Sequence, residues 1–250
     1  MFTARRPMRS LIAASLIMMI AACDSSTPSD AVAGEAPAGA AKAGAVASKD
    51  WTQATVATAD GGFLMGNPDA KVKIIEFASV SCSHCADFHA TSKVPLENYI
   101  RTGNVSYEMR TFLLGGPLDP PVSLAVRCQG AAPFFRLTDD IFRTQKTWMQ
   151  TAFDNQAKLA ELEGQPQADQ LVGLLRIAGL DSFFAARGLP GAKLKQCMTD
   201  TKQIDFLGKI RNDGVNKHGL TGTPTFVLNG ETLEGVSSWP ALEPKIKAAL

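Results

Sequence analysis

Hydrophobic and polar positions along the chain follow two different spacings, and the shorter one predicts strands. Four segments have the alternating or continuous apolar pattern of short strands, namely residues 72–77, 105–112, 225–228 and 231–233. Asn229-Gly230 separates the last two, and this dipeptide is a strong signal for a two-residue hairpin turn. Residues 52–66 contain shorter alternating pieces broken by 60–62, which predicts another hairpin.

The longer spacing, with apolar residues every three or four positions, predicts helices over much of the remaining chain. The predicted helical segments run from after Ser81 to about Ile100 and over 122–128, 134–148, 168–178, 181–184, 194–210 and 240–250. Pro95 lies inside the first of them and predicts a kink. The order is strand, helix, strand, helical block, hairpin and helix, which predicts an α/β sheet domain interrupted by an all-helical insertion.

This order sets the expected domain boundaries within the 250 residues. The sheet domain is expected to comprise 51–114 and 215–250, with the helical insertion at 115–214. Residues 23–50 consist mainly of Ala, Gly, Ser and Pro, which cannot bury enough apolar surface to offset the entropy of ordering. We expect this segment to be a flexible tether.

The N-terminus has the pattern of an export signal. Arg5, Arg6 and Arg9 precede an apolar run at 11–20, which is too short to span a membrane as a helix. The run ends in Ala-Ala-Cys23, which resembles a bacterial lipobox. We therefore expect 1–22 to be a lipoprotein signal peptide and Cys23 to carry the lipid. A plain secretory signal cut after Ala33 is the alternative.

The export signal predicts a periplasmic location, anchored to the membrane by lipid. Asp24 follows the lipobox cysteine and favours the inner membrane; without lipidation of Cys23 the protein is expected to be soluble in the periplasm. The net charge of +1 falls to −2 without residues 1–22, because they carry three arginines and no acid. No basic field therefore points to nucleic acid as a partner.

The main chemical signal is the sequence Cys82-Ser83-His84-Cys85, which admits several interpretations. Zinc ligation by Cys82, Cys85 and His89, with His218 or Cys128 as the fourth ligand, has acceptable spacing. The absence of a second Cys-x-x-Cys pair weakens it. Covalent haem fails because Ala86 stands where a histidine is required. A purely structural bridge would close a very short loop and stabilise little.

A redox-active pair explains the context best, because the motif follows a predicted strand and opens a predicted helix. Cys82 would lie in the first turn, where unpaired backbone N–H groups and the helix dipole favour a thiolate. A protonated His84 would add to this effect. Cys85, one turn further in, is expected to be more buried and to resolve mixed disulfides. Such a pair needs no metal and no further cofactor.

Two distant features support this interpretation. Glu76 lies in an otherwise apolar strand, where an unpaired carboxylate is costly to bury. It is either a buried proton acceptor for Cys85 or an outward-facing charge on an edge strand. Gly222-Thr223-Pro224-Thr225 directly precedes another predicted strand, and its Thr-Pro bond is either an ordinary trans turn or a rarer cis bond.

Together these motifs resemble the DsbA family of thiol-disulfide oxidoreductases, over roughly residues 60–250. The resemblance implies a thioredoxin-like fold with an all-helical insertion. It implies that Cys82 is the attacked and leaving sulfur, that Cys85 resolves, and that Glu76 moves protons. It also implies that Thr223 and a cis Pro224 line the substrate groove. Many members have proline where this chain has Ser83, so the oxidising strength stays open.

Cys128 and Cys197 lie 69 residues apart in predicted helices of the insertion. In an exported protein their expected fate is a structural disulfide, and some DsbA-like proteins resemble this chain in having a second bridge. Two unpaired buried thiols are the alternative. The five cysteines would then comprise one lipid anchor, one catalytic pair and one structural bridge.

The predicted function is the introduction of disulfides into unfolded or partly folded exported proteins by a monomer that a membrane redox partner reoxidises. A reductase or isomerase using the same site, and a non-catalytic tethered metal-binding module, are the alternatives. The single histidines His89 and His218 are expected at the surface or at helix ends. Six aromatic residues at helical spacing are expected in the core, namely Phe134, Phe135, Phe142, Trp148, Phe183 and Phe184.

Overall fold

The structure is a computed structural model that describes residues 49–250. The predicted signal peptide, the predicted lipidation site Cys23 and nearly all of the predicted tether lie outside the described residues. Within 49–250, no helix is both long enough and apolar enough to cross a membrane.

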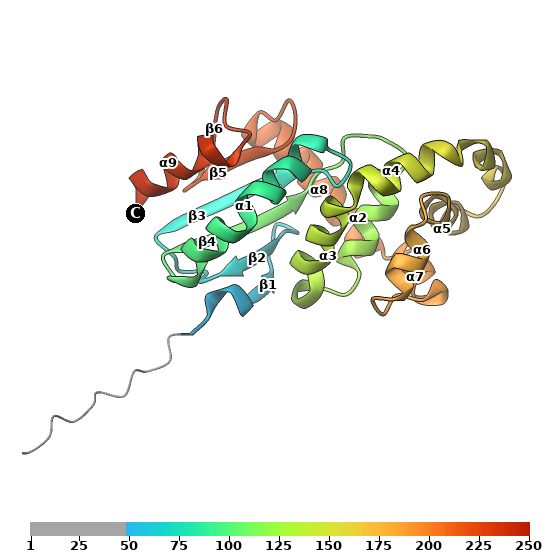
Figure 1. The fold of residues 1–250 in the computed structure, drawn as a ribbon, viewed down its shortest axis with the longest axis horizontal. Coiled ribbons are helices and arrows are strands. Elements are labelled where there is room, and N and C mark those ends of the chain that lie inside the picture. Colours follow the sequence, from blue (N-terminus) through green and yellow to red (C-terminus); the bar gives the residue numbers. More distant parts are fainter. Residues whose placement is uncertain (1–48) are drawn as a thin grey trace, which may run out of the picture. The chain divides into compact units, whose positions relative to one another are not determined.

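A six-stranded mixed sheet forms the centre of the fold (Figure 1). Its strands are β1 (Thr55–Ala57), β2 (Phe63–Gly66), β3 (Val72–Ala78), β4 (Val105–Thr111), β5 (Thr225–Leu228) and β6 (Glu231–Leu233). Their spatial order is β1-β2-β4-β3-β5-β6. β3 and β4 are parallel and the other pairs are antiparallel, so both predicted hairpins are confirmed.

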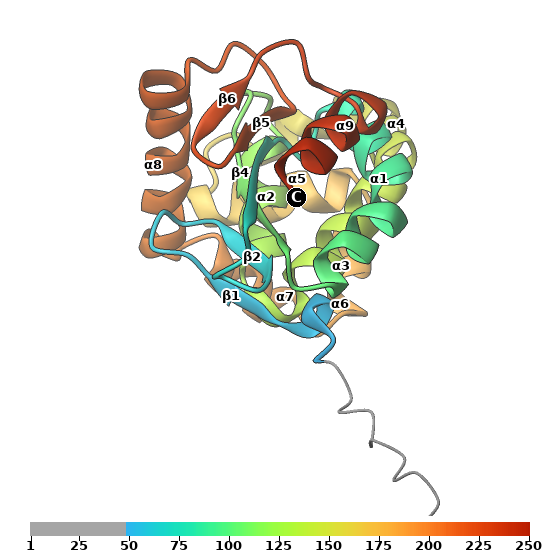
Figure 2. The same ribbon diagram turned by 90° about the vertical axis from the view of Figure 1, so that its left-hand side faces the viewer.

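Helices cover both faces of this sheet and build the insertion beside one end of it. The α-helices are α1 (Ser83–Arg101), α2 (Asp119–Arg127), α3 (Ala131–Arg143), α4 (Gln145–Asp154), α5 (Gln167–Ile177), α6 (Leu180–Ala185), α7 (Gly191–Cys197), α8 (Thr201–His218) and α9 (Trp239–Ala249). Two 3-10 helices, η1 (Trp51–Gln53) and η2 (Gln156–Leu162), complete the set within 49–250. α8 lies on one face and α1 and α9 on the other (Figure 2), while α2 to α7 gather where α1 begins (Figure 1).

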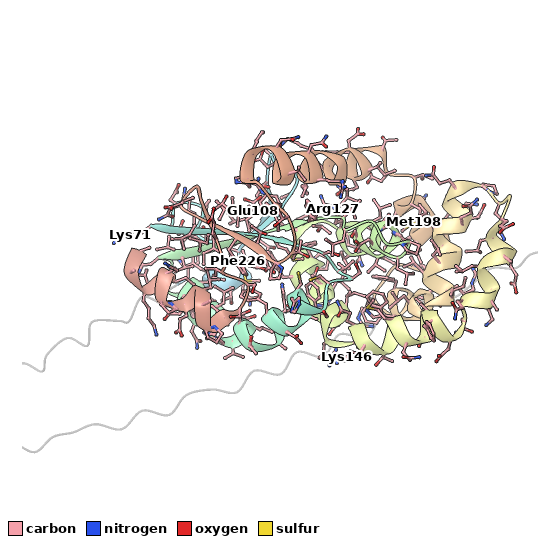
Figure 3. The ribbon with its side chains drawn as sticks, turned by 90° about the horizontal axis from the view of Figure 1, so that it is seen from above. Lys71, Glu108, Arg127, Lys146, Met198 and Phe226 are labelled. Atoms are coloured by element: carbon pink, nitrogen blue, oxygen red, sulfur yellow. A yellow bond between two sulfur atoms is a disulfide. The ribbon has the colours of Figure 1, made fainter. Side chains whose placement is uncertain are left out.

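Two hydrophobic clusters correspond to these layers. The smaller one, on the α8 side of the sheet, comprises Phe77, Phe112, Ile210, Leu220 and Val227. The larger one runs without interruption from the α1 and α9 side of the sheet into the insertion. Figure 3 shows Phe226 in the sheet and Met198 within the insertion, and both side chains belong to this larger cluster. Sheet domain and insertion therefore share one core.

The insertion contains more helix breaks than the sequence pattern predicted. The stretch predicted at 134–148 divides at Thr144 into α3 and α4, and the stretch predicted at 194–210 divides into α7 and α8. Asp200 causes the second break, because its side chain accepts from the backbone N–H of Gln203 and caps α8. α8 also continues past the expected boundary at 214 to His218, where Gly219 caps it in the left-handed conformation.

The aromatic residues expected in the core lie there, with Phe183 only half-buried. Pro95 lies inside α1, which continues on both sides of it, and its kink stays a prediction.

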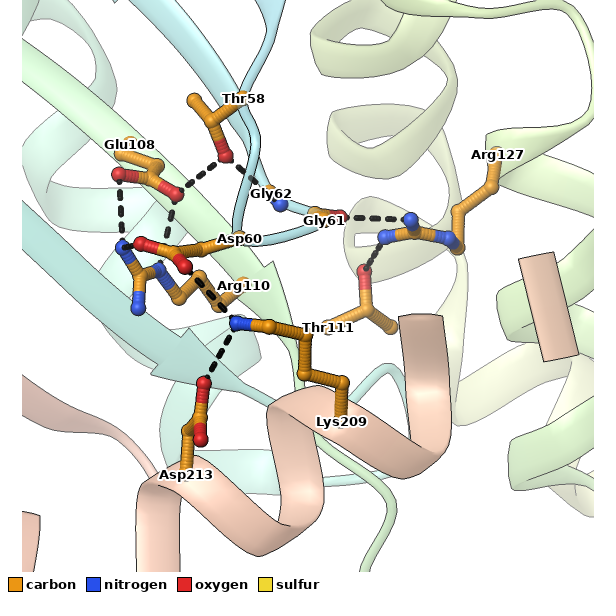
Figure 4. Close-up of polar contacts among 10 residues, drawn as sticks. All are labelled: Thr58, Asp60, Gly61, Gly62, Glu108, Arg110, Thr111, Arg127, Lys209 and Asp213. Carbon is orange, nitrogen blue, oxygen red and sulfur yellow. Dashed lines mark hydrogen bonds and ion pairs between the residues drawn. The ribbon is translucent and has the colours of Figure 1, made fainter. Parts of the chain in front are cut away.

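Charged side chains hold α8 against the sheet (Figure 4). Arg110 on β4 donates to Glu108 on the same strand at 2.8 Å and to Asp60 in the β1–β2 turn at 3.0 Å. Lys209 of α8 then donates to the same Asp60 and to Asp213, one turn further along the helix. The β1–β2 turn is therefore bonded both to the sheet and to α8.

Arg127 joins the insertion to this turn (Figures 3 and 4). Its side chain is almost fully buried and donates to the carbonyl oxygen of Gly61 at 2.6 Å and to Gln203 of α8 at 3.0 Å. Gly61 has a φ of +87°, and a Cβ there would lie 2.6 Å from the Phe206 ring, so the turn requires glycine.

The Cys128–Cys197 pairing expected from the sequence is present as a disulfide with Cα atoms 5.5 Å apart. It links the end of α2 to the end of α7 and closes a loop with a sequence separation of 69.

Replacing both Cys128 and Cys197 with serine should lower the free energy of unfolding by roughly 4 kcal/mol, because the unfolded chain regains the entropy that the bridge removes. The measurement is the midpoint of guanidinium unfolding. The matched control replaces Cys82 and Cys85 with serine, which leaves the structural bridge intact and should change the midpoint far less. Equal midpoints for the native protein and the Cys128/Cys197 variant would contradict a stabilising bridge.

Candidate active site

The cysteine motif lies where β3 ends and α1 begins, as its sequence context predicted. Cys82 is the N-cap of α1, with extended backbone angles, and its sulfur accepts the backbone N–H of Cys85 at 3.4 Å. Its carbonyl oxygen accepts from the N–H of Ala86 and starts the helical pattern. The sulfur thus takes the place of a capping oxygen at the end of a helix where N–H groups lack partners.

This position lowers the pKa of the Cys82 thiol to about 5. The largest cause is the hydrogen bond that the Cys85 thiol donates to it, and burial opposes the effect. The backbone N–H groups of Cys85 and His84 lower the pKa further. At neutral pH the reduced protein therefore holds Cys82 as a thiolate.

His84 contributes through its backbone, and its imidazole is exposed. The cationic effect of the imidazole that the sequence suggested is not among the causes that lower the Cys82 pKa. Its role therefore stays a prediction.

Cys85 has the opposite character. It is completely buried, and burial is the first cause of a pKa well above the ordinary thiol value. The hydrogen bond to Cys82 and the negative charge of Glu76 raise it further. The two thiols of one motif thus have very different pKa values, because they lie at different depths in the protein.

The loop before β5 faces Cys82. The Thr223–Pro224 peptide bond is cis, as the resemblance implied, and the Cys82 sulfur lies 3.2 Å from the carbonyl oxygen of Thr223. When protonated, the thiol donates to this oxygen. The Thr223 hydroxyl is buried and makes no hydrogen bond with another described residue. The fold thus brings Cys82 into contact with Thr223, which lies 141 positions further along the chain.

Glu76 is fully buried beneath the cysteines. β3 lies between β4 and β5, so the alternative of an outward-facing charge on an edge strand is wrong. One carboxylate oxygen, Oε2, accepts from the Tyr107 hydroxyl and lies 3.2 Å from His89 Nε2. The other, Oε1, has no hydrogen-bond partner among the described residues. A buried carboxylate oxygen without a donor is a ready acceptor for a proton.

His89 corrects the expectation of a surface or helix-capping histidine. It is buried on α1, with Nε2 toward Glu76 and Nδ1 3.3 Å from Asp139 of α3. Burial alone would lower its pKa, but Glu76 and Asp139 outweigh burial and raise it to about 9. Asp139 also pairs with Lys93. Charges of alternating sign therefore extend from Glu76 toward the surface.

The sequence did contain a signal for His89. It follows Cys85 by four residues, so both side chains lie on the same face of one helix. His218 agrees better with its expectation, because it is the last residue of α8, only half-buried, with its ring beside Phe77.

A groove of about 800 Å³ borders the site. It begins at Ser83, beside Cys82, and runs along α1 past Ala86, Ala90 and Val94, with α3 and the start of α4 on its other side. His89 and Asp139 both line it, so the buried charges reach solvent there. No cluster of three or more potential ligands placed to hold a metal ion occurs within residues 49–250.

Known proteins are similar to this chain in sequence. A family model described as Thioredoxin matches residues 58–248. Two rickettsial proteins, each named "Putative protein-disulfide oxidoreductase", are 28% identical to the chain: that of Rickettsia bellii over 70% of it and that of Rickettsia felis over 68%. The chain spans only 59% and 54% of these two relatives.

Solved structures agree with the fold. A protein-disulfide isomerase from Novosphingobium aromaticivorans has a TM-score of 0.70 and 28% identity, covering 76% of this chain and 98% of that one. Wolbachia pipientis alpha-DsbA1 has a TM-score of 0.56 and 23% identity, covering 74% and 89% of the two chains. The family match extends over most of the chain and the fold is that of DsbA-type structures, so this protein belongs to the thioredoxin family.

Proposed function

We propose that the protein is a thiol-disulfide oxidoreductase in which Cys82 and Cys85 alternate between a disulfide and a dithiol. One observation carries this proposal: two sulfurs of the same motif differ sharply in acidity, with the pKa of Cys82 at about 5 and that of Cys85 well above the ordinary value. A thiolate at Cys82 stabilises the reduced protein, so its disulfide readily accepts electrons.

The reaction begins when a substrate thiolate attacks Cys82, which is 8% exposed, whereas Cys85 is inaccessible. The Cys82–Cys85 bond breaks, a mixed disulfide forms, and Cys85 leaves and takes up a proton. A second substrate thiolate then attacks the substrate sulfur and releases Cys82 as a stable thiolate. Two electrons have passed from the substrate to the protein. Backbone groups beside Thr223 and Pro224 are available to bind an extended substrate.

Glu76 handles the proton of Cys85 in this proposal. During reoxidation Cys85 must lose its proton before it can attack, and burial makes that loss unfavourable. The free Oε1 of Glu76 accepts the proton, while His89 and Tyr107 hold Oε2 in place. The same carboxyl group returns the proton when Cys85 leaves.

The proposed direction is oxidation of unfolded or partly folded exported proteins, with reoxidation by a membrane redox partner. The export signal and the tether support this direction, because a lipid on Cys23 would hold the enzyme near such a partner. We place the protein in the periplasm on the same grounds, and at the inner membrane because Asp24 follows the lipidated cysteine.

A second candidate is disulfide isomerisation, which the name of the Novosphingobium aromaticivorans structure favours. Equilibration of the Cys82/Cys85 pair with glutathione separates the two. An equilibrium that keeps the dithiol until glutathione disulfide is high supports the oxidase, and an equilibrium that forms the protein disulfide already at low glutathione disulfide supports the reductase or isomerase.

Alkylation by iodoacetamide should be half-maximal near pH 5 for Cys82, because only the thiolate reacts. The Cys85→Ser variant isolates this sulfur and keeps a hydroxyl donor in place of the Cys85 thiol. The matched Cys85→Ala variant removes that donor, so its Cys82 pKa should be higher. Identical titration curves for the two variants would show that the hydrogen bond from residue 85 does not stabilise the thiolate.

The reduced protein should lose stability relative to the oxidised protein as the pH falls from about 9 to about 5. The folded state lowers the pKa of Cys82 from 9.0 to about 5, so its stabilisation is complete above the unfolded value and disappears as the pH falls through the folded value. Thermal unfolding of both redox forms across this pH range measures the difference. A constant difference would contradict the thiolate assignment.

Glu76→Gln should slow the resolution of a mixed disulfide at pH 7 by about a hundredfold, because the isosteric amide cannot accept the Cys85 proton. Rapid-quench kinetics of the reduced protein with a disulfide-bonded peptide measures this step, in which Cys85 attacks the mixed disulfide at Cys82 and releases the peptide. Glu108→Gln is the matched control, since Glu108 is another buried carboxylate on the neighbouring strand but pairs with Arg110. Equal rates for the native protein and Glu76→Gln would remove Glu76 from the mechanism.

A further inference from the structure

The segment that presents Cys82 is held by the helical insertion as well as by the sheet domain. Gln145, the first residue of α4, is 3% exposed. Its side-chain amide nitrogen donates to the carbonyl oxygens of Val80 and Cys82, each at 2.9 Å. Both N–H groups of the amide therefore bond to segment 80–82, which ends at the reactive cysteine.

Asp119 holds the same segment from a second helix of the insertion. It is fully buried at the start of α2, and one carboxylate oxygen accepts from the hydroxyls of Ser79 and Ser81, both at 2.7 Å. Its other oxygen accepts the backbone N–H of Leu114 at 2.7 Å. No cation pairs with this carboxylate among the described residues, so hydrogen bonds alone stabilise it.

The corner between α3 and α4 fixes the position of Gln145. The break at Thr144 turns the chain, and the buried Trp148 donates from its ring nitrogen to the carbonyl oxygen of Ile141 across that corner at 3.0 Å. The carboxamide thus extends from a packed helix start rather than from a loop. Such support keeps a functional group within the narrow tolerance that catalysis requires.

We propose that Gln145 and Asp119 are positioning residues through which the insertion sets the acidity of Cys82 and the oxidising strength of the Cys82/Cys85 pair. The Cys82 sulfur accepts the N–H of Cys85 only while Cys82 keeps its extended N-cap conformation. Gln145 fixes the carbonyl oxygen of that same residue, and Asp119 fixes the two serines before it. Loss of either contact lets the sulfur leave the donors that stabilise its charge.

This inference rests on the proposed function for its consequence in disulfide exchange, but the acidity of Cys82 is measurable without any substrate. The test replaces Gln145 with methionine, which has similar length and no donor. Gln150→Met is the matched control, because Gln150 lies on the same helix, is exposed and bonds only to Asp154. Thiolate absorbance of the reduced protein gives the Cys82 pKa, and glutathione equilibration gives the oxidising strength.

Gln145→Met should raise the Cys82 pKa and weaken oxidation of glutathione by roughly tenfold, since one unit of thiol pKa corresponds to a tenfold change in thiolate stability. Gln150→Met should change neither. A lower melting temperature with an unchanged pKa and equilibrium would make Gln145 merely structural and overturn the proposal. Absence of disulfide exchange in the native protein, together with a shifted pKa in Gln145→Met, would reject the function and leave the positioning role intact.

A measurement on the native protein covers the case in which the variant does not fold. The side-chain amide protons of Gln145 should exchange slowly with solvent, observed by nuclear magnetic resonance, because both are bonded inside the protein. Fast exchange, as expected for the exposed Gln150, would overturn the proposal. Asp119→Ala offers a second variant, because it removes both acceptor oxygens, and it should raise the Cys82 pKa in the same direction.

Discussion

The candidate active site is arranged around one sulfur, that of Cys82 at the start of α1, where the fold favours a negative charge. A sulfur at a helix N-cap gathers N–H donors that the helix leaves unpaired, and the Cys85 thiol adds the strongest contribution. Burial works against the charge, so the donors must outweigh a real desolvation cost. The remaining parts of the site supply those donors, hold them in place or, in the proposed mechanism, exchange a proton with Cys85.

The charged groups around Glu76 are buried in pairs of opposite sign. Glu76 would be costly at the centre of the sheet on its own, and His89 and Tyr107 make it tolerable. His89 is in turn held by Asp139, which reaches the groove beside α1 and pairs there with Lys93. These charges extend from Glu76 to the groove at the surface, and one oxygen of Glu76 makes no hydrogen bond with another described residue.

The helical insertion has a closer relation to the site than a separate domain would have. It shares a continuous core with the sheet, donates to the Cys82 segment through Gln145 and accepts from it through Asp119. Arg127 bonds the insertion to the β1–β2 turn. The Cys128–Cys197 disulfide links two helices inside the insertion. Its rigidity therefore bears directly on the geometry around one sulfur.

The sequence by itself determined the parts of this protein that depend on local chemistry. These parts lie in short segments whose conformational preferences come from their own residues. They are the periodic strands, the Asn229-Gly230 turn, the Cys-x-x-Cys motif at a strand–helix junction and the Thr223-Pro224 loop. The tertiary structure alone decided which distant groups meet. It buried His89 against Glu76 and placed Gln145 and Asp119 against the reactive segment. These contacts depend on how the helices pack against the sheet. Packing brings together residues that are far apart in the sequence, so no periodic pattern along the chain predicts them.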